Sequence, residues 1–432
     1  MSVEGDANRR TWVLGAGAVL AAGAMGRSTN LAARPQAAGS VADAEIIQPF
    51  RVAVPDRALD DLRARLRMRR LPERETVTDW SQGVPRDRLE HLLNTWERDY
   101  DWRRFEARLN ALPQFVTSID GLGIHFIHVR SKHADALPLI LTHGWPGSVA
   151  EFLEAVAPLT DPEAHGGTAQ DAFHLVIPSI PGHGFSDKPR ETGWGPERVG
   201  RAWAELMRRL GYSRYVSQGG DHGSVISDAM ARLRLPGLAG IHVNMPATVP
   251  PEIADLLRCG APAPAELPPD ERAAFDQLES FYRTGGAYAA MMTTKPQTLG
   301  YSLSDSPSGL AAFFYEKFAA WTYPGGAPER ALTVDEMLDD ISLYWLTDTA
   351  TSAARFYWEN NANNFNAVDI DLPTAVTIFP GEIYRAPRRW TERAYRSLVY
   401  FNKASKGGHF AAWEEPELFA TELRAALRSF RA

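Results

Sequence analysis

The stretch Tyr215-Val216-Ser217-Gln218-Gly219-Gly220-Asp221-His222-Gly223-Ser224 decides the fold. Its first four residues are typical of a short buried strand, and a helical pattern begins just after Gly223. A residue held at a sharp turn from strand to helix has a strained backbone and needs small neighbours on both sides. Gly219 and Gly223 leave that room around Asp221. The spacing therefore predicts that Asp221 is presented at a nucleophile turn.

The residue at the centre of this turn determines the expected chemistry. Serine is the common residue there and must lose a proton before it attacks, whereas a carboxylate is already charged near neutral pH. An aspartate suits attack on an sp³ carbon that bears a leaving group, as in an epoxide or an alkyl halide. The alternative is a glycine-rich turn in which Asp221 only caps a helix. A phosphate-binding loop is not indicated, because the Gly-x-Gly-x-x-Gly spacing does not occur here.

Strands and helices alternate on both sides of this turn. Asp120-Gly121 favours a tight hairpin turn between two alternating segments, residues 115–119 and 124–129. Further strands are expected at residues 137–142, 174–178, 215–218, 375–379 and 398–401, and helices from about residue 151, over 196–210, after Gly223 and over 416–430. The alternation predicts an α/β protein with the α/β-hydrolase fold, in which helices cover both faces of a mostly parallel central sheet.

The remaining segments divide the chain into five parts. Residues 45–112 are helical and charged, with Asp56 as the expected cap of a first helix and a second helix from about Arg86 to Asp99. Proline-rich sequence from Met245 to about Ala265 marks a boundary, and an aromatic, helical insertion follows it. The expected parts are an export signal and linker (1–44), an N-terminal helical segment (45–112), the core (113–246 and 366–432) and a helical lid (247–365).

A histidine and a carboxylate follow the nucleophile in the chain order that this fold requires. Lys406-Gly407-Gly408-His409-Phe410 lies between the last expected strand and the last helix, where the fold places its base. His409 is therefore the candidate base that activates water against an ester on Asp221. Glu382 follows the preceding strand, and a carboxylate there can hold the imidazole in one tautomer and stabilise its charged form.

The oxyanion formed during ester hydrolysis needs two hydrogen-bond donors. His143-Gly144-Trp145-Pro146-Gly147 follows an early strand, at the point where the fold builds half of its oxyanion hole. Because Pro146 has no N–H, the Trp145 amide is the expected first donor, and the His222 amide is the second. His143 itself is interpreted as a structural histidine of the turn.

Composition excludes several other classes of function. The chain has 432 residues, 44% of them hydrophobic, and a formal net charge of −7. The arginines of residues 63–70 lie in an expected helix and are interpreted as a solvated face. A nucleic-acid partner is therefore not expected. Cys259 is the single cysteine, which excludes an intrachain disulfide, and the eleven histidines show no metal-ligand spacing. We expect neither a metal nor a cofactor, and the sequence carries no signal for an oligomeric state.

The N-terminus resembles a twin-arginine export signal. Arg9 and Arg10 precede an apolar run over residues 11–25, which is too short and too rich in glycine for a stable membrane span. Ala42-Asp43-Ala44 offers a cleavage site. We expect an exported protein, periplasmic or secreted; an uncleaved signal that tethers the chain to a membrane is the alternative.

Five runs of sequence carry a family resemblance: residues 143–148, 219–224, 294–296, 305–310 and 408–416. With these runs, nearly all of the chain after Ile46 resembles the microsomal-type epoxide hydrolases. The resemblance includes the N-terminal segment, which the soluble epoxide hydrolases lack. The resemblance implies that the chain converts an epoxide and water to a vicinal diol through an ester on Asp221. It also implies a role in epoxide detoxification or in aromatic hydrocarbon catabolism.

The resemblance also implies two lid tyrosines that bind the epoxide oxygen. Tyr288 precedes Thr294-Lys295-Pro296 at the family's separation, and Tyr357 lies in Arg355-Phe356-Tyr357-Trp358-Glu359-Asn360. Phenolic donors can stabilise and protonate the alkoxide that forms when the ring opens. Without the resemblance, both tyrosines would be interpreted as packing residues of the lid.

The sequence departs from the family's pattern in two places. His222 stands where animal members of the family commonly have tryptophan, and the export signal replaces their membrane-anchoring helix.

Two rival functions remain open. A dehalogenase would use the same aspartate but would need Trp or Asn donors for a halide. A member of the fold that binds a ligand without catalysis is the other rival. The aromatic residues of the lid favour a bulky apolar epoxide.

Overall fold

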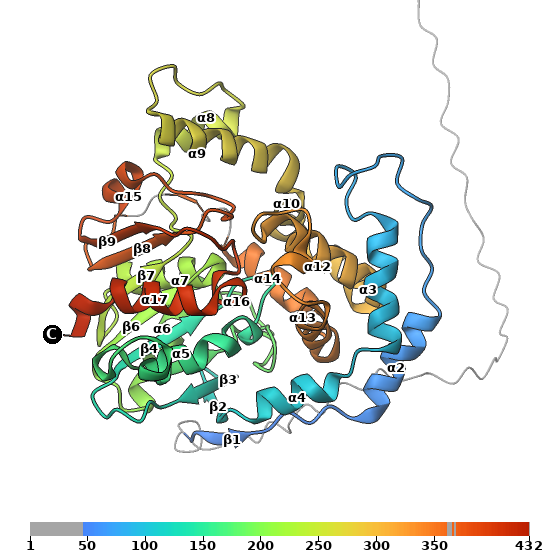
Figure 1. The fold of residues 1–432 in the computed structure, drawn as a ribbon, viewed down its shortest axis with the longest axis horizontal. Coiled ribbons are helices and arrows are strands. Elements are labelled where there is room, and N and C mark those ends of the chain that lie inside the picture. The colour runs from blue at the N-terminus through green and yellow to red at the C-terminus, as the bar shows by residue number, and fades with distance from the viewer. Residues whose placement is uncertain (1–45, 361–364, 367–368, 432) are drawn as a thin grey trace, which may run out of the picture. The chain divides into compact units, whose positions relative to one another are not determined.

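A nine-stranded sheet forms the centre of the protein, whose computed structural model describes residues 46–360, 365–366 and 369–431 (Figure 1). The strand order is β1-β2-β3-β5-β4-β6-β7-β8-β9. Strands β1, β2, β3 and β5 pair antiparallel, and β5, β4, β6, β7, β8 and β9 pair parallel. The strands are β1 (Gln48–Phe50), β2 (Gln114–Ile119), β3 (Leu122–Val129), β4 (Leu137–Thr142), β5 (Phe173–Pro178), β6 (Tyr215–Gly219), β7 (Leu238–Val243), β8 (Thr374–Ile378) and β9 (Leu398–Lys403).

The expected hairpin joins β2 and β3. Ile119 pairs with Leu122, and the two residues between them, Asp120 and Gly121, have φ values of 52° and 77°. Positive φ at both central residues is the geometry that Asp-Gly favours in a tight hairpin, because it matches the twist of the strands. The mostly parallel α/β-hydrolase sheet predicted from the sequence is confirmed.

Helices cover both faces of the sheet. Helix α6 contacts α7 on one face, and α5 contacts α17 on the other (Figure 1). A 3₁₀ helix, Val149–Ala155, precedes α5. The core helices are α5 (Val156–Thr160), α6 (Pro196–Arg209), α7 (Asp221–Arg232), α15 (Arg388–Ala394), α16 (Ala411–Glu414) and α17 (Pro416–Ala426).

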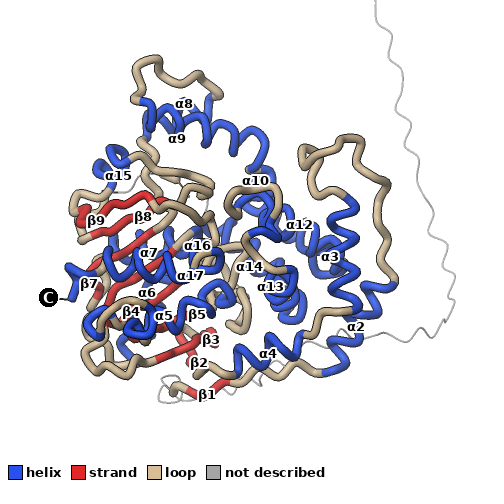
Figure 2. The backbone as a smooth tube through the Cα atoms, viewed as in Figure 1, coloured by secondary structure: helices blue, strands red, loops and turns tan. Residues whose placement is uncertain are grey.

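The helical insertion between β7 and β8 forms the lid. Figure 2 shows the strands gathered in one sheet, with α10, α12, α13 and α14 grouped together beside it. The insertion confirms the helical lid expected from the aromatic, strand-poor sequence. Its helices are α8 (Pro251–Cys259), α9 (Pro269–Ser280), α10 (Ala287–Thr294), α11 (Pro296–Asp305), α12 (Pro307–Trp321), α13 (Val334–Thr347) and α14 (Ala350–Asn360).

The N-terminal helices hold the lid from outside. Helices α2 (Asp56–Arg67), α3 (Arg86–Arg98) and α4 (Trp102–Asn110) contact α12 or α13. Trp96 donates its indole N–H to the Ser342 hydroxyl at 2.8 Å, and the Tyr100 hydroxyl donates to Asp339 at 2.8 Å. All four side chains are buried. These contacts fix α13, and through it the lid, to the N-terminal segment.

Several local expectations were wrong or incomplete. Asp56 does not cap α2; Pro55 takes the cap position, and the Asp56 carboxylate instead pairs with Arg103. The helix expected from Glu151 begins two residues earlier as a 3₁₀ helix. Strands β1 and β7 and helix α4 were not predicted, because β1 has three residues and glycine and alanine weaken the strand pattern of β7.

The proposed export signal lies outside the described residues. Within residues 46–360, 365–366 and 369–431, no helix has both the length and the apolar character needed to cross a membrane.

Candidate active site

The turn between β6 and α7 presents Asp221 in the backbone conformation that a nucleophile turn requires. Asp221 has φ 47°, in the left-handed region that residues with a side chain rarely adopt. A Cβ atom on Gly219 would lie 2.0 Å from the carbonyl carbon of Gly223, and one on Gly223 would lie 1.9 Å from the Thr142 oxygen. Since both approaches are far below contact distance, only glycine fits at either position, as the sequence spacing predicted.

The loop after β4 lies against the Asp221 carboxylate. The Trp145 N–H donates to Asp221 Oδ1 at 2.9 Å. A Cβ atom on Gly144 would lie 2.3 Å from the Asp221 Cβ, so glycine is required for this close approach. The Trp145 amide thus lies where it can stabilise negative charge on one oxygen of the Asp221 carboxyl group.

His409 lies on the other side of the carboxylate. Its Nε2 is 3.7 Å from Asp221 Oδ2, and its Nδ1 is 2.6 Å from Glu382 Oε1. Glu382 Oε1 also accepts the Ile383 N–H at 2.8 Å, which fixes the carboxylate. The proton on Nδ1 is directed to Glu382, so neutral His409 has its free nitrogen facing Asp221.

Electrostatic effects on His409 oppose one another. Burial alone lowers the pKa of its imidazole, but the adjacent Glu382 carboxylate, together with the charge of Asp221, raises that pKa to about 9. His409 is 6% exposed, so water screens these interactions little. Loss of either negative charge therefore makes His409 easier to deprotonate.

An aromatic wall from the lid closes the space above Asp221. The Tyr288 ring stacks on Trp145 at 5.0 Å between centroids, and the Tyr357 ring is 5.8 Å from Tyr288. Burial raises the pKa of both phenols, so both stay protonated at neutral pH.

Among the described residues, the buried Tyr357 hydroxyl and Trp145 indole N–H have no hydrogen-bond partner of normal geometry. Lys317 places its ammonium 4.3 Å from the centre of the Tyr288 ring.

His222 follows the nucleophile as the second residue of α7. Helix N–H groups in the first turn have no partner within the helix, so the His222 amide is available to an oxyanion. Its ring is buried, 4.5 Å from the Tyr357 ring and 4.6 Å from the Phe356 ring, and burial lowers its pKa. Neutral His222 therefore contributes an aromatic surface beneath the lid.

His143 has the structural role expected from the sequence. Its Nε2 accepts the Ile180 N–H at 3.1 Å, and its Nδ1 donates to the Gly144 carbonyl at 3.0 Å. Both ring nitrogens are occupied, and burial lowers its pKa to about 4. The ring holds the loop after β4 against the loop after β5.

The structure brings together all seven residues singled out from the sequence. Asp221, His409 and Glu382 form one chain of contacts, the Trp145 and His222 backbones flank the carboxylate, and the two tyrosines face it from the lid. No cluster of ligands that could hold a metal occurs within the described part of the chain. A carboxylate at the nucleophile turn, served by a histidine and a glutamate, makes this protein an α/β-hydrolase.

Comparison with known proteins gives the family. Residues 47–152 match the family profile described as "Epoxide hydrolase N terminus", and residues 138–416 match that described as "alpha/beta hydrolase fold". A protein of Stigmatella aurantiaca named "Putative epoxide hydrolase" is 55% identical over 89% of this chain and 86% of its own length. Epoxide hydrolase 1 of Sus scrofa is 36% identical over 90% of both chains. The chain therefore belongs to the epoxide hydrolase family, in its microsomal type, and it is an epoxide hydrolase.

Solved structures agree with this assignment. The juvenile hormone epoxide hydrolase of the silkworm Bombyx mori superposes with a TM-score of 0.81 at 33% identity, covering 89% of this chain and 95% of the other. The epoxide hydrolase of Aspergillus niger superposes with a TM-score of 0.78 at 33% identity, covering 90% and 98%.

Proposed function

We propose that this epoxide hydrolase works in two steps through a covalent ester on Asp221. The observation that carries the proposal is the position of the Asp221 carboxylate, between the Trp145 N–H at 2.9 Å and the His409 imidazole at 3.7 Å. One neighbour can stabilise an oxyanion and the other can activate water, as hydrolysis of an ester requires.

In the first step, an oxygen of Asp221 attacks a ring carbon of the epoxide. A C–O bond forms to Asp221 while the ring C–O bond breaks, and the released oxygen takes a proton from the paired phenols of Tyr288 and Tyr357. The Tyr357 hydroxyl supports this role, because it is buried without a hydrogen-bond partner of normal geometry and the epoxide oxygen would supply an acceptor. The product of the step is a hydroxyalkyl ester.

In the second step, water attacks the carboxyl carbon of that ester. His409, oriented by Glu382, takes a proton from the water, and the Trp145 and His222 amides hold the oxyanion. The bond between the carboxyl carbon and the ester oxygen, which came from Asp221, then breaks, and the leaving diol takes the proton held by His409. The acid proton of the regenerated Asp221 restores the phenol.

Removal of either phenolic hydroxyl should slow ring opening. Tyr288→Phe and Tyr357→Phe retain the stacked rings but each deletes one donor, and loss of one such donor costs about 10²-fold in rate. The measurement is the single-turnover rate of ester formation in each variant. Tyr301→Phe is the matched control, because Tyr301 lies on α11 with 72% of its surface exposed. Wild-type ring opening in both active-site variants would exclude the tyrosines as donors.

The substrate proposal is a bulky apolar epoxide, of the kind that arises in detoxification or in aromatic hydrocarbon catabolism. Its support is the apolar wall around Trp145, to which Phe313, Phe314 and Trp321 contribute rings within 6.2 Å of the indole centroid. A panel of epoxides, assayed for diol formation, tests both the activity and this preference. Halide release from alkyl halides without diol formation would instead support the dehalogenase.

The location proposal is export through the twin-arginine pathway. It rests on Arg9-Arg10 and the apolar run that follows them. The chain, expressed with a periplasmic reporter, should reach the periplasm, and Arg9→Lys with Arg10→Lys should retain it in the cytoplasm. Equal distribution of both forms would contradict the proposal.

A further inference from the structure

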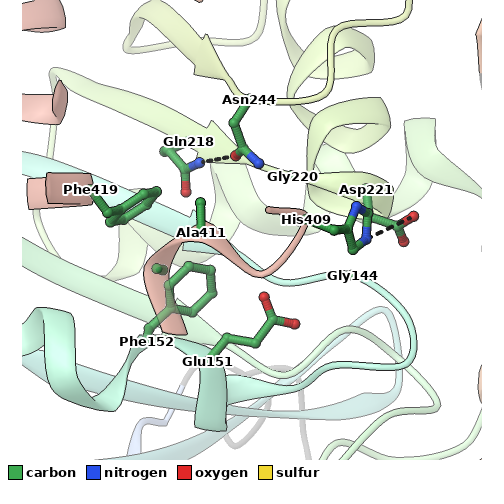
Figure 3. Close-up of a pocket in the computed structure, with 11 residues that line it drawn as sticks. Gly144, Glu151, Phe152, Gln218, Gly220, Asp221, Asn244, His409, Ala411 and Phe419 are labelled. Atoms are coloured by element: carbon green, nitrogen blue, oxygen red, sulfur yellow. Dashed lines mark hydrogen bonds and ion pairs between the residues drawn. The ribbon is translucent and has the colours of Figure 1, made fainter. Parts of the chain in front are cut away.

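A cavity lies on the core side of the Asp221–His409 pair (Figure 3). Its volume is about 20 Å³, which is room for one or two water molecules. Asp221 and His409 line it together with three polar side chains that the catalytic steps have not used, Glu151, Gln218 and Asn244. Figure 3 shows the Glu151 carboxyl pointing from the 3₁₀ helix toward the space beside His409.

The Glu151 side chain is held in place by the loop that it contacts. A Cβ atom on Gly147 would lie only 1.4 Å from Glu151 Oε1, so the missing side chain of Gly147 provides the space for the carboxyl group. Tyr344 fixes Gly147 by donating its hydroxyl to the Gly147 carbonyl at 2.8 Å. Glu151 is 9% exposed, and the Gly144 backbone forms a hydrogen bond with its carboxyl group. A group confined in this way is preorganised for a single task.

The environment favours the neutral form of Glu151. Burial raises the pKa of its carboxyl group well above the usual range; nearby positive His409 opposes this shift, and the negative charges of Asp340 and Asp221 support it. A neutral carboxyl group offers one O–H donor and one acceptor, and it does not repel the Asp221 carboxylate. Both properties suit a group that binds water beside a charged nucleophile.

Gln218 gives an independent reason to expect water in the cavity. Its Nε2 donates to Asn244 Oδ1 at 2.9 Å, while its buried Oε1 has no partner among the described residues. Buried acceptors almost always have a protein or water partner. Water in the cavity would supply a donor to Gln218 and would also lie beside His409.

We propose that Glu151 is a further catalytic residue that holds the hydrolytic water against His409 and the Asp221 ester. The inference rests on the two-step mechanism proposed above. The water oxygen bonds to the carboxyl carbon of Asp221 while one water proton moves to His409 Nε2. The bond from that carbon to the ester oxygen, which came from Asp221, then breaks, and the leaving diol takes the proton from His409. Glu151 gains and loses no proton in the step, because it orients the water through its hydrogen bonds.

The test separates the two half-reactions in a single turnover. Ester formation and ester hydrolysis are followed by rapid quench and intact mass, in the wild type, Glu151→Leu and Glu151→Gln. Leucine removes the hydrogen bonds, so hydrolysis should slow by about 10- to 100-fold, the scale of a misplaced reactant. Ring opening should keep its wild-type rate in this variant. Glutamine retains a donor and an acceptor and should restore hydrolysis to near the wild-type rate.

A second variant displaces the carboxyl group without changing it. Gly147→Ala puts a methyl group where Glu151 Oε1 lies, and it should also slow hydrolysis while ring opening is unchanged. Asp228→Asn is the matched control, because Asp228 is a buried acid with its pKa raised by burial to about 7, hydrogen-bonded to Tyr395 away from this cavity. Both half-reactions should be unchanged in the control.

Two results would overturn the role of Glu151. One is wild-type ester hydrolysis in Glu151→Leu or, should that variant not fold, in Gly147→Ala. The other is equal slowing of both half-reactions in Glu151→Leu and Glu151→Gln, which would make Glu151 structural. Failure of the two-step mechanism has a different signature, since the wild type would then form diol without any ester.

Discussion

An Asp221→Asn variant is expected to form diol at least about 10⁴-fold more slowly than the wild type, the scale seen when a catalytic nucleophile is removed. Asparagine has nearly the same size, and its Oδ1 can still accept the Trp145 N–H that holds Asp221 at 2.9 Å. The fold should therefore survive while the attacking oxygen anion is lost. Diol formation from an epoxide that the wild type hydrolyses is the measurement.

Two controls accompany this variant. Asp228→Asn makes the same chemical change at another buried aspartate of α7 and should leave the rate unchanged. Intact mass of the Asp221→Asn protein, before and after the assay, excludes hydrolysis of the new amide back to aspartate. Diol formation at the wild-type rate by the intact variant would remove Asp221 from the mechanism.

A His409→Gln variant should open one equivalent of epoxide and then stop. Ring opening needs Asp221 and the phenols, whereas hydrolysis needs a base, and loss of a general base costs about 10²- to 10⁴-fold. Glutamine can still bond to Glu382, which otherwise lies 2.6 Å from His409 Nδ1. Rapid-quench measurement of epoxide consumption and diol release should show a burst followed by slow turnover. Absence of a burst, with both rates reduced together, would contradict this division of roles.

The pH dependence of ester hydrolysis in the wild type is a second test of His409 as the base. Against the lowering effect of burial, Glu382 and then Asp221 raise the pKa of His409 to about 9, so the free enzyme holds His409 protonated at neutral pH. Ester formation removes the Asp221 charge, which lowers that pKa. Since the base must be neutral, ester hydrolysis should accelerate as pH rises and level off above an apparent pKa below about 9. A hydrolysis rate that falls over the same range would contradict the role of His409.

The local sequence was sufficient to predict the nucleophile turn. Only glycine fits at positions 219 and 223, because a Cβ atom at either position would lie within 2.0 Å of a backbone atom. Such a steric requirement leaves a spacing that can be read directly. The chain order of Asp221, Glu382 and His409 was also predictable, because the fold places each group after a particular strand. Tyr288 and Tyr357 could be assigned only by family resemblance, since their spacing does not differ from that of packing residues.

Glu151 shows what local sequence could not predict. The sequence pattern places Glu151 only at the start of a helix, whereas in the structure it lines a cavity with Gln218, Asn244 and His409, which are distant in the chain. The one available signal was the glycine at position 147 followed four residues later by an acid, which gains meaning only when the loop lies against Asp221 and His409. The contacts of Trp96 and Tyr100 with α13 are a second example. The periodicity of a helix predicts which of its faces is buried, but not which distant helix packs against that face.

The covalent ester on Asp221 is the central claim, and intact mass of His409→Gln after mixing with an epoxide tests it most directly. The protein mass should rise by the mass of one substrate molecule, and peptide mapping should place the addition on the peptide that contains Asp221. An Asp221→Asn, His409→Gln double variant should show no addition. An unmodified His409→Gln protein that forms diol at the wild-type rate would contradict the mechanism.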